Sequence, residues 1–502
     1  MEKVFNELSG YWIVIINRIF INHLIKSIQL TIIIMKFGGS CLKNSNSFNN
    51  SLHAVNKFID NKLVLVCSAI SGITNYLIET SAEIENRTCK PEEKIEYLKN
   101  IHETLANDII KNKEYLAECL EYINNSLERL KNTLYGVYEI GATTRSTDFI
   151  LSFGERLSTY IFYEFLRDNG LNVEYKSADK FIYTNMEYKN QLPLLEKSKE
   201  AILTEFKDSI NKSKICVVTG YISRNIRGNV TTLGRGGSDL TATILGYSLK
   251  ELDNDVKIIL WKDVPGLLTA NPKIEKNAKL IREISFDEAR EMAYFGSKVL
   301  HPLCIIPAQK AKIPIEIRNF NDQNSDDYTT IGDFKEPPQI HKEHPIKAIT
   351  SSNAAMITVS GEAMVSLPGT AARIFTIMGE NNVNVIMISQ SSSENNITFL
   401  VEDKEDEIKR AKEALENSEF FGKEFFNIKI EENVSLIAVV GPMAYIPGVA
   451  GKLFSLMGDN NINIRAIAQG SSELNISFVI KREECERAIR IIHKGFGLDK
   501  GD

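Results

Sequence analysis

The sequence has few of the residues that mark disulfide-rich, zinc-binding or nucleic-acid-binding proteins. Its seven cysteines are scattered and form no Cys-x-x-Cys pair. This argues against a disulfide framework or a zinc site and favours reduced thiols in a cytoplasmic protein. The 59 basic residues do not exceed the 65 acidic ones, so nothing indicates nucleic acid as a partner. The 502 residues are 43% hydrophobic and 25% charged, a composition typical of a globular chain of about three domains.

The sequence also lacks the unbroken run of ~20 apolar residues that a membrane-spanning helix needs. Residues 11–16 and 28–34 are apolar, but Asn17, Arg18 and Lys26 interrupt the stretch between them. Glutamates near the start and a missing cleavage site argue against a signal peptide. We therefore expect no membrane partner, and we treat residues 1–30 as an extension of doubtful function.

Short apolar segments that end in glycine or polar residues recur along the first half of the chain. They are residues 32–40, 63–68, 215–220 and 256–261. Alternating with helical stretches, they predict a mostly parallel sheet covered on both faces, with ligands bound where the strands end. Residues 85–135 are rich in lysine and glutamate with apolar residues at helical spacing, which predicts a helical insertion without chemistry of its own.

An internal repeat makes up the C-terminal third. Shifting the chain by 79 residues places 367–401 over 446–480, and 17 of the 35 aligned pairs are identical. Each copy has the pattern of a strand, a Pro-Gly turn, an amphipathic helix, an Asn-Asn turn and two more strands. The repeat predicts two small α/β domains, at 348–420 and 430–498. Residues 326–347 have the composition of a linker.

The chain lacks the Walker phosphate-binding pattern and the protein-kinase signatures. Lys36-Phe-Gly-Gly-Ser40 nevertheless places a cation beside two glycines where a strand ends. Glycines let the backbone approach an anion closely, and successive N–H groups form an anion-binding nest. Taken alone, such a turn is more often structural than functional.

A second anion-binding pattern is Gly234-Arg-Gly-Gly-Ser-Asp239, which precedes a helix. The N-terminus of a helix attracts anions, and Arg235 offers a guanidinium suited to a carboxylate. Asp239 has two interpretations. It is either a helix N-cap or a carboxylate beside phosphates, where it would order Mg²⁺ or Lys36.

Seven motifs in this order resemble those of aspartate kinases, and the repeat resembles their tandem ACT pair. The motifs are residues 36–40, 71–75, 152–158, 232–241, 261–266, 295–302 and 313–319. The resemblance implies an amino-acid-kinase-like three-layer α/β/α domain over residues 31–325, followed by two ferredoxin-like (βαββαβ) ACT domains. Because the chain ends soon after the second repeat, we expect the monofunctional form and not a fusion to homoserine dehydrogenase.

The resemblance implies transfer of the γ-phosphoryl group of ATP, as its Mg²⁺ complex, to the side-chain carboxylate of L-aspartate. The product would be 4-phospho-L-aspartate, the first step toward lysine, threonine and methionine. A free aspartate carboxylate has a pKa near 3.9, so the nucleophile is ionised at pH 7 and needs no general base. Catalysis is then expected to come from positioning and charge neutralisation, with Lys36 stabilising the phosphoryl group and Asp239 orienting Lys36.

The remaining site residues are also implied by the resemblance. The expected aspartate-binding residues are Thr74, Glu155, Arg235 and Ser238. The expected ATP-binding residues are Lys36, Gly38, Gly39, Ser40, Lys262, Asp263, Lys273, Ser297 and Lys298. No resident metal site is expected. The chain departs from the family's usual residues at Pro265, Leu268 and Asn271, all within the expected nucleotide-binding stretch.

Regulation is implied by the ACT pair. In this family ACT domains carry feedback inhibition by an amino acid, and Gln390, Ser392, Gln469 and Ser471 resemble the effector-binding pattern of threonine-responsive members. Threonine is favoured over lysine, and the alternative is that the repeat only joins two chains into a homodimer or larger oligomer.

Two other functions remain open: a kinase for another amino-acid carboxylate, and a non-catalytic amino-acid sensor. The family's first strand begins near the chain start. We therefore expect the functional chain to begin near Met35, immediately before Lys36.

Overall fold

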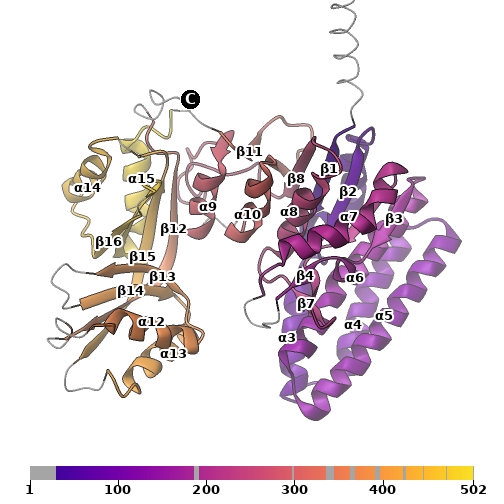
Figure 1. The fold of residues 1–502 in the computed structure, drawn as a ribbon, viewed down its shortest axis with the longest axis horizontal. Coiled ribbons are helices and arrows are strands. Elements are labelled where there is room, and N and C mark those ends of the chain that lie inside the picture. Colours follow the sequence, from indigo (N-terminus) through magenta and orange to yellow (C-terminus); the bar gives the residue numbers. More distant parts are fainter. Residues whose placement is uncertain are drawn as a thin grey trace, which may run out of the picture. The chain divides into compact units, whose positions relative to one another are not determined.

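The computed structural model is drawn in Figure 1. It describes residues 30–500 except 186–190, 297–298, 335–343, 362–363, 365–367, 391–395, 422–425, 445 and 471. Its contacts divide the chain into two compact units, Met1–Trp261 and Lys262–Asp502.

Parallel strands form the centre of the first unit. In spatial order they are β3 (Val173–Lys176), β5 (Ile215–Thr219), β2 (Lys62–Cys67), β1 (Ile32–Phe37) and β8 (Val256–Lys262). All six residues of β1 are buried. Since successive side chains of a strand point to opposite faces, both faces of the sheet are covered. The predicted mostly parallel sheet is confirmed.

The start of β1 corrects one prediction. The strand begins at Ile32, and Ile32, Ile33 and Ile34 are at most 4% exposed. They pair with β2 on one side and β8 on the other. A functional chain beginning at Met35 would therefore lose half of a central strand, so that predicted start is wrong for the fold. Residues 1–29 lie outside the described residues.

Helices α6 and α8 pack directly on this sheet. Helix α6 contacts β2, β3 and β5, and α8 contacts β1 and β2. The predicted helical insertion forms α4 and α5, whose inner faces are buried. The helices of this unit are α2 (Ser45–Asn56), α3 (Ile73–Glu85), α4 (Pro91–Ile109), α5 (Lys113–Ile140), α6 (Thr144–Asp168), α7 (Leu195–Asn211) and α8 (Gly237–Leu249), with 3-10 turns at Gly39–Leu42 and Ala178–Lys180.

A small second sheet leads the chain into α8. Strands β4 (Tyr183–Thr184), β6 (Ile222–Asn225) and β7 (Val230–Thr232) pair in that order. Because β7 ends three residues before Arg235, this sheet positions the turn that carries the second anion-binding pattern.

The second unit opens with strands and helices that precede the repeat. Strand β11 (Tyr328–Gly332) pairs with β10 (Ile315–Asn319) on one side and β9 (Glu283–Ser285) on the other. Helices α9 (Phe286–Tyr294) and α10 (Pro302–Ala311) lie between β9 and β10 in the chain.

Strand β11 overturns part of the predicted linker at 326–347. Its Thr329 and Ile331 are fully buried, with 0% exposure. The Thr329 hydroxyl also accepts a hydrogen bond from the Leu267 N–H (2.8 Å) and donates one to the Ile281 carbonyl (2.6 Å). The segment is so polar that two buried side chains at alternate positions do not predict a strand from the sequence. Residues 335–343 lie outside the described residues.

The repeat forms one six-stranded antiparallel sheet with helices. Its strand order is β13 (Val385–Gln390), β14 (Asn396–Glu402), β12 (Ala348–Ser360), β15 (Asn427–Val440), β17 (Asn475–Lys481) and β16 (Ala466–Gln469). Its helices are α12 (Thr370–Glu380), α13 (Glu405–Glu416), α14 (Val449–Asp459) and α15 (Cys485–Gly495), with a 3-10 turn at Arg482–Glu484.

The two long strands of this sheet serve both copies of the repeat. The second half of β12, from Ala354 to Ser360, pairs with β14 of the first copy. Its first half, from Ala348 to Ala354, pairs with the part of β15 that also pairs with β17 of the second copy. Residues 348–354 thus precede the first copy of the repeat in the chain but complete the sheet of the second copy. The pattern of the repeat in the sequence does not show this pairing.

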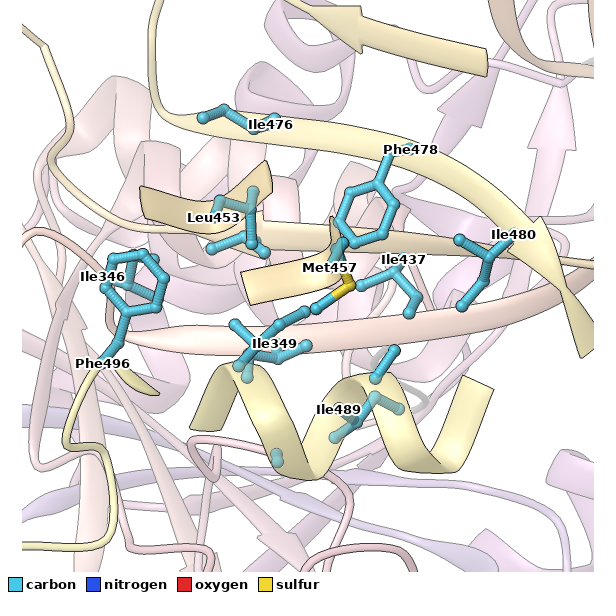
Figure 2. Close-up of a cluster of buried hydrophobic side chains, with 14 of the residues drawn as sticks. Ile346, Ile349, Ile437, Leu453, Met457, Ile476, Phe478, Ile480, Ile489 and Phe496 are labelled. Carbon is cyan, nitrogen blue, oxygen red and sulfur yellow. The ribbon is translucent and has the colours of Figure 1, made fainter. Parts of the chain in front are cut away.

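Each copy buries its own apolar cluster between its helices and its half of the sheet. Figure 2 shows the cluster of the second copy, where Leu453, Phe478 and Ile489 come from α14, β17 and α15. The repeated turns have a backbone reason: Asn382 and Asn461 both lie in the left-handed region, at φ +53° and +54°. Asparagine tolerates that region better than most residues.

Candidate active site

Lys36 and Asp239 form a buried ion pair at the carboxyl end of β1. Lys36 Nζ lies 2.9 Å from Asp239 Oδ1, and the two side chains are 8% and 6% exposed. Asp239 is in the first turn of α8, where the helix dipole favours a carboxylate. A buried pair gains little net stability because both charges lose their water. The pair therefore points to a function, and it supports the second interpretation of Asp239.

The glycine turn after Lys36 lies against the loop that follows β2. A Cβ on Gly39 would stand 2.8 Å from the Ala69 carbonyl oxygen and 3.0 Å from the Ser71 nitrogen. The Ser71 N–H donates to the Gly39 carbonyl at 3.2 Å. Only glycine permits this close approach. A Cβ on Gly38 would lie 3.6 Å from Lys36 Nζ, so the turn and the lysine adjoin.

Ser40 lies in the exposed part of the 3-10 turn Gly39–Leu42. Thr74 is half-buried in the first turn of α3, the helix that follows the β2 loop. Both residues therefore lie beside the two loops that Gly39 brings together.

Glu155 is a buried acid that contacts the same loop from α6. Glu155 is only 3% exposed to solvent. Burial raises its pKa to about 8, against the opposing effects of the Ala69 N–H, which donates to the carboxylate, and of the Lys36 charge. Among the described residues, Oε2 of Glu155 has no hydrogen-bond partner. Such a group is an acceptor suited to a cationic ligand.

The start of α8 holds two further candidates. Gly236 precedes the helix with φ +71°, which favours glycine. Ser238 is 8% exposed and abuts the end of β5, since a Cβ on Gly220 would lie 2.6 Å from Ser238 Cβ. Arg235 is exposed on the turn between β7 and α8, where its guanidinium can reach solvent or a ligand.

A hydrogen-bonded chain beside this site was not predicted. Asp148 accepts hydrogen bonds from the Thr232 hydroxyl (2.9 Å) and the Gln191 amide (2.7 Å), and burial raises its pKa. Tyr221 is hydrogen-bonded to Thr232, and burial raises its pKa to about 12. Tyr221 also has φ +66°, a strained backbone for a bulky residue and a frequent sign of a functional site.

Only weak signals in the sequence pointed to these residues. Thr232 opens the motif at 232–241, and Tyr221 follows the glycine that ends β5. Asp148 carried no signal, because its partner Thr232 is 84 residues away in the chain.

The other nucleotide candidates lie in the second unit. Lys262 ends β8 and is half-buried, and its carbonyl accepts the Phe320 N–H at 2.7 Å. Asp263 and Lys273 are exposed in the segment between β8 and β9, and the Lys273 N–H donates to Asn271 Oδ1 at 3.0 Å. Ser297 and Lys298 lie outside the described residues.

A cavity of about 210 Å³ in the first copy of the repeat reaches one effector candidate, Gln390. The cavity is lined by Met364, Pro368, Gly369, Thr370, Ala371, Gln390 and Ile397. Gln469, at the corresponding place in the second copy, is exposed at the end of β16. Ser392 and Ser471 lie outside the described residues.

The comparisons with known proteins define the class of protein. The chain belongs to the amino acid kinase family, whose model matches residues 31–319. An ACT-domain model matches twice, at residues 357–418 and 437–496.

The resemblance to aspartate kinases is confirmed among curated relatives. The bifunctional aspartokinase/homoserine dehydrogenase 1, chloroplastic, of Arabidopsis thaliana is 35% identical over 473 residues, covering 93% of this chain and 51% of the relative. The chain thus spans about half the length of the first such relatives. Aspartokinase 2, chloroplastic, of the same plant is 29% identical and is covered over 84% of its length.

Solved structures agree with this fold over nearly the whole chain. Aspartokinase III of E. coli, solved in complex with aspartate and ADP, is 26% identical with a TM-score of 0.77, covering 92% of this chain and 99% of that one. The aspartate kinase of Clostridium acetobutylicum is 26% identical with a TM-score of 0.71, covering 92% and 100%. The predicted fold class, an amino-acid-kinase domain followed by ACT domains, is confirmed.

Two further features were searched for in the described part of the chain. No group of three or more histidine, cysteine, aspartate or glutamate side chains there is arranged to hold a metal ion. Nor does any helix within that part combine the length and apolar character that crossing a membrane requires.

Proposed function

We propose that this protein is an aspartate kinase, which transfers the γ-phosphoryl group of ATP to the side-chain carboxylate of L-aspartate. The products are 4-phospho-L-aspartate and ADP. The observation that carries the proposal is the buried ion pair of Lys36 and Asp239 beside the glycine turn, with Glu155 close enough for the lysine charge to lower its pKa. The likeness to E. coli aspartokinase III, which binds aspartate and ADP, supports it.

The chemistry needs little from the protein beyond charge and position. The attacking carboxylate oxygen is ionised at neutral pH. It forms a bond to the γ-phosphorus while the bond to the β,γ-bridging oxygen breaks, and ADP leaves. The obstacle is the approach of one anion to another, which preorganised cations and N–H groups reduce. Magnesium enters as the counter-ion of the substrate ATP.

We assign the roles as follows. Lys36 neutralises the charge of the transferring phosphoryl group, and Asp239 keeps the lysine ammonium in place at 2.9 Å. Glu155 receives the α-ammonium of aspartate, and Arg235 pairs with a substrate carboxylate. Thr74 and Ser238 donate hydrogen bonds to the substrate.

The residues assigned to the nucleotide are those that the resemblance to aspartate kinases implies. Gly38, Gly39 and Ser40 would meet its phosphates through the nest of N–H groups that follows β1. The candidates of the second unit are Lys262, Asp263, Lys273, Ser297 and Lys298.

The raised pKa of Glu155 predicts how aspartate binding depends on pH. With a pKa of about 8, Glu155 is mostly protonated in the empty site at pH 7, whereas an ammonium ligand binds its ionised form. The ionised fraction rises about tenfold per pH unit below the pKa. The KM for aspartate should therefore fall roughly 15-fold between pH 6.5 and 8, and it should level off near pH 9.

Steady-state kinetics across this pH range, at saturating ATP, measure the effect. Glu155→Gln serves as the comparison: its KM should be raised and flat with pH. A wild-type KM that does not change with pH would show that Glu155 does not ionise on binding aspartate.

Trapping the acyl phosphate with hydroxylamine tests the proposal as a whole. The expected result is a hydroxamate that requires both aspartate and ATP. Glutamate and other amino acids with a carboxylate side chain, assayed in parallel, test the alternative acceptor. Absence of product with every acceptor, from folded protein, would indicate an amino-acid sensor.

We propose that the ACT pair makes the enzyme sensitive to an end-product amino acid, with threonine favoured over lysine. Gln390 lines the cavity of the first copy together with Thr370, which gives a small polar ligand a place beside amide and hydroxyl groups. E. coli aspartokinase III has been solved in complex with lysine and aspartate, so an amino-acid effector fits this fold. An effector inhibits only if it binds one conformation better than another.

Separate titrations of threonine and lysine into the hydroxamate assay should show inhibition by threonine at the lower concentration. Gln390→Ala should raise the inhibitory concentration about tenfold or more, by loss of side-chain hydrogen bonds, and leave uninhibited turnover unchanged. Gln469→Ala is the matched variant in the second copy. If both variants respond like the wild type, the effector does not bind through these glutamines.

We propose that the enzyme acts in the biosynthesis of lysine, threonine and methionine, works in the cytoplasm, and forms a homodimer or larger homo-oligomer through its ACT domains. The scattered free cysteines support a reducing compartment. The plant relatives named above are chloroplastic, so a fractionation experiment has two compartments to distinguish.

A further inference from the structure

The segment between β8 and β9 folds into an irregular hairpin. Leu268 and Leu280 form an antiparallel bridge. Thr269 N–H donates to the Lys279 carbonyl, and Ile281 N–H donates to the Leu267 carbonyl, each at 2.9 Å. This hairpin, residues 267–281, contains Lys273, one of the proposed nucleotide contacts.

Thr269 joins the hairpin to the second copy of the repeat. Its hydroxyl oxygen accepts the Lys279 N–H at 2.9 Å and lies 2.9 Å from Nε2 of His493 on α15. Its carbonyl accepts the Ile349 N–H from β12 at 2.8 Å. Thr269 and His493 are 8% and 1% exposed, so solvent does not compete for these bonds.

The groups around Thr269 and His493 are compatible with a hydrogen bond to a neutral imidazole. The Thr269 oxygen already accepts a hydrogen from Lys279, and its own hydrogen remains for Nε2 of a neutral imidazole. Burial lowers the pKa of His493, against the opposing charges of Glu275 and Asp499. A neutral His493 accepts from the Thr269 hydroxyl in one tautomer and donates to the Thr269 oxygen in the other.

Two further contacts hold the hairpin at the same helix. Arg490, one turn before His493, donates from Nε to the Ile274 carbonyl at 3.0 Å. Ala270 belongs to the apolar cluster of the second copy, and Ile274 and Ala278 pack against it. Figure 2 shows Ile349 and Ile489 within this cluster. The hairpin is therefore packed as part of the second ACT domain.

We propose that His493 is a positioning residue for the nucleotide, acting through Thr269 to hold the hairpin 267–281 in its binding conformation. This rests on the proposed assignment of Lys273 to ATP. The second ACT domain then does more than pair with the first, since its last helix fixes a segment of the kinase domain. The affinity for ATP depends on the link, and the affinity for aspartate does not.

The test compares His493→Leu and Thr269→Val, which remove the imidazole and the hydroxyl at nearly unchanged volume, with Thr269→Ser, which keeps the hydroxyl. Loss of the bond should raise the KM for ATP about 3- to 10-fold, with kcat and the KM for aspartate within about twofold of the wild type. Thr269→Ser should restore the wild-type value. Because Thr269→Val also removes the acceptor of the Lys279 N–H, the double variant should show no more than the effect of Thr269→Val alone.

The matched control is Ile489→Val, which trims the same helix within the same cluster. It should lower the melting temperature and leave the KM for ATP unchanged, as would any purely structural effect. An unchanged KM for ATP in folded Thr269→Val overturns the inference. So does a loss in the variants that appears only in kcat.

Binding of ADP, followed by titration calorimetry, separates this inference from the proposed function. If wild-type protein neither binds ADP nor makes hydroxamate, the proposed function fails. If the wild-type protein binds ADP and makes hydroxamate, and Thr269→Val binds ADP equally well, the positioning role of His493 is wrong and the proposed function stands. Weaker ADP binding by the variant supports it, even where the acceptor is an amino acid other than aspartate.

Discussion

Replacing Lys36 with alanine should lower kcat by at least ~1,000-fold, because one preorganised charge at a developing transition state is worth about that much. The lysine is the cation that the ion pair holds against the glycine turn. Water molecules that entered in place of the ammonium group would have to reorient around the developing charge. Measured by hydroxamate formation at saturating aspartate and ATP, turnover should approach the background.

The substitution also leaves Asp239 buried without its cation, which costs roughly 3–5 kcal/mol. A second variant separates folding from catalysis. Lys36→Ala combined with Asp239→Asn removes the stranded charge, and it should recover much of the lost melting temperature without recovering turnover.

The matched control is Lys62→Ala in β2. Lys62 Nζ also lies close to a buried aspartate, 3.1 Å from Asp253 Oδ2, and its side chain is 25% exposed. This variant should lose some stability and keep its kcat within about twofold. If Lys36→Ala retains turnover comparable to that of Lys62→Ala, Lys36 has no catalytic role.

Deleting residues 1–34 should abolish soluble expression, whereas deleting residues 1–29 should leave expression and activity intact. The longer deletion removes Ile32, Ile33 and Ile34, which are at most 4% exposed. A buried isoleucine contributes about 1.5–3 kcal/mol, so three contribute roughly 5–9 kcal/mol. A whole domain is stable by only about 5–15 kcal/mol.

Soluble yield and the melting temperature of both truncations check this prediction, with the full chain beside them. The two truncations differ only by residues 30–34, so a difference between them reports on the start of β1 and the two residues before it. A folded and active 35–502 protein would show that Ile32 to Ile34 are dispensable for the sheet. A loss of activity on removing residues 1–29 would assign a function to the extension.

Local patterns predicted the elements that depend on neighbouring residues. The apolar runs at 32–40 and 215–220 became β1 and β5, because a strand buried on both faces must be apolar at every position. The repeat predicted the turns, and its Asn-Asn pairs indeed adopt left-handed backbone at Asn382 and Asn461. The prediction of a linker was wrong for the segment that contains β11. The side chains of this strand are buried by residues distant in the chain, such as Leu267, whose N–H donates to Thr329.

The candidate site was predictable where a motif carries its own chemistry. A lysine before two glycines and an aspartate at a helix start are visible in the sequence, and the structure joins them at 2.9 Å. Asp148 and Tyr221 were not visible, since a single acid and a single tyrosine have no local signature. Their significance lies in a hydrogen-bonded chain through Thr232 and in the positive φ of Tyr221.

The class of fold, the two copies of the ACT domain and the residue types of the proposed phosphoryl-transfer site were predictable from the amino-acid sequence. Periodicity, glycine turns and an internal repeat can all be recognised in the order of the residues along the chain. The completion of both ACT sheets by β12 and the burial that raises the pKa of Glu155 depend on long-range packing. It alone brought Thr269 to His493, across 224 residues of chain. Burial and long-range hydrogen bonds depend on which surfaces meet, and no local pattern records that.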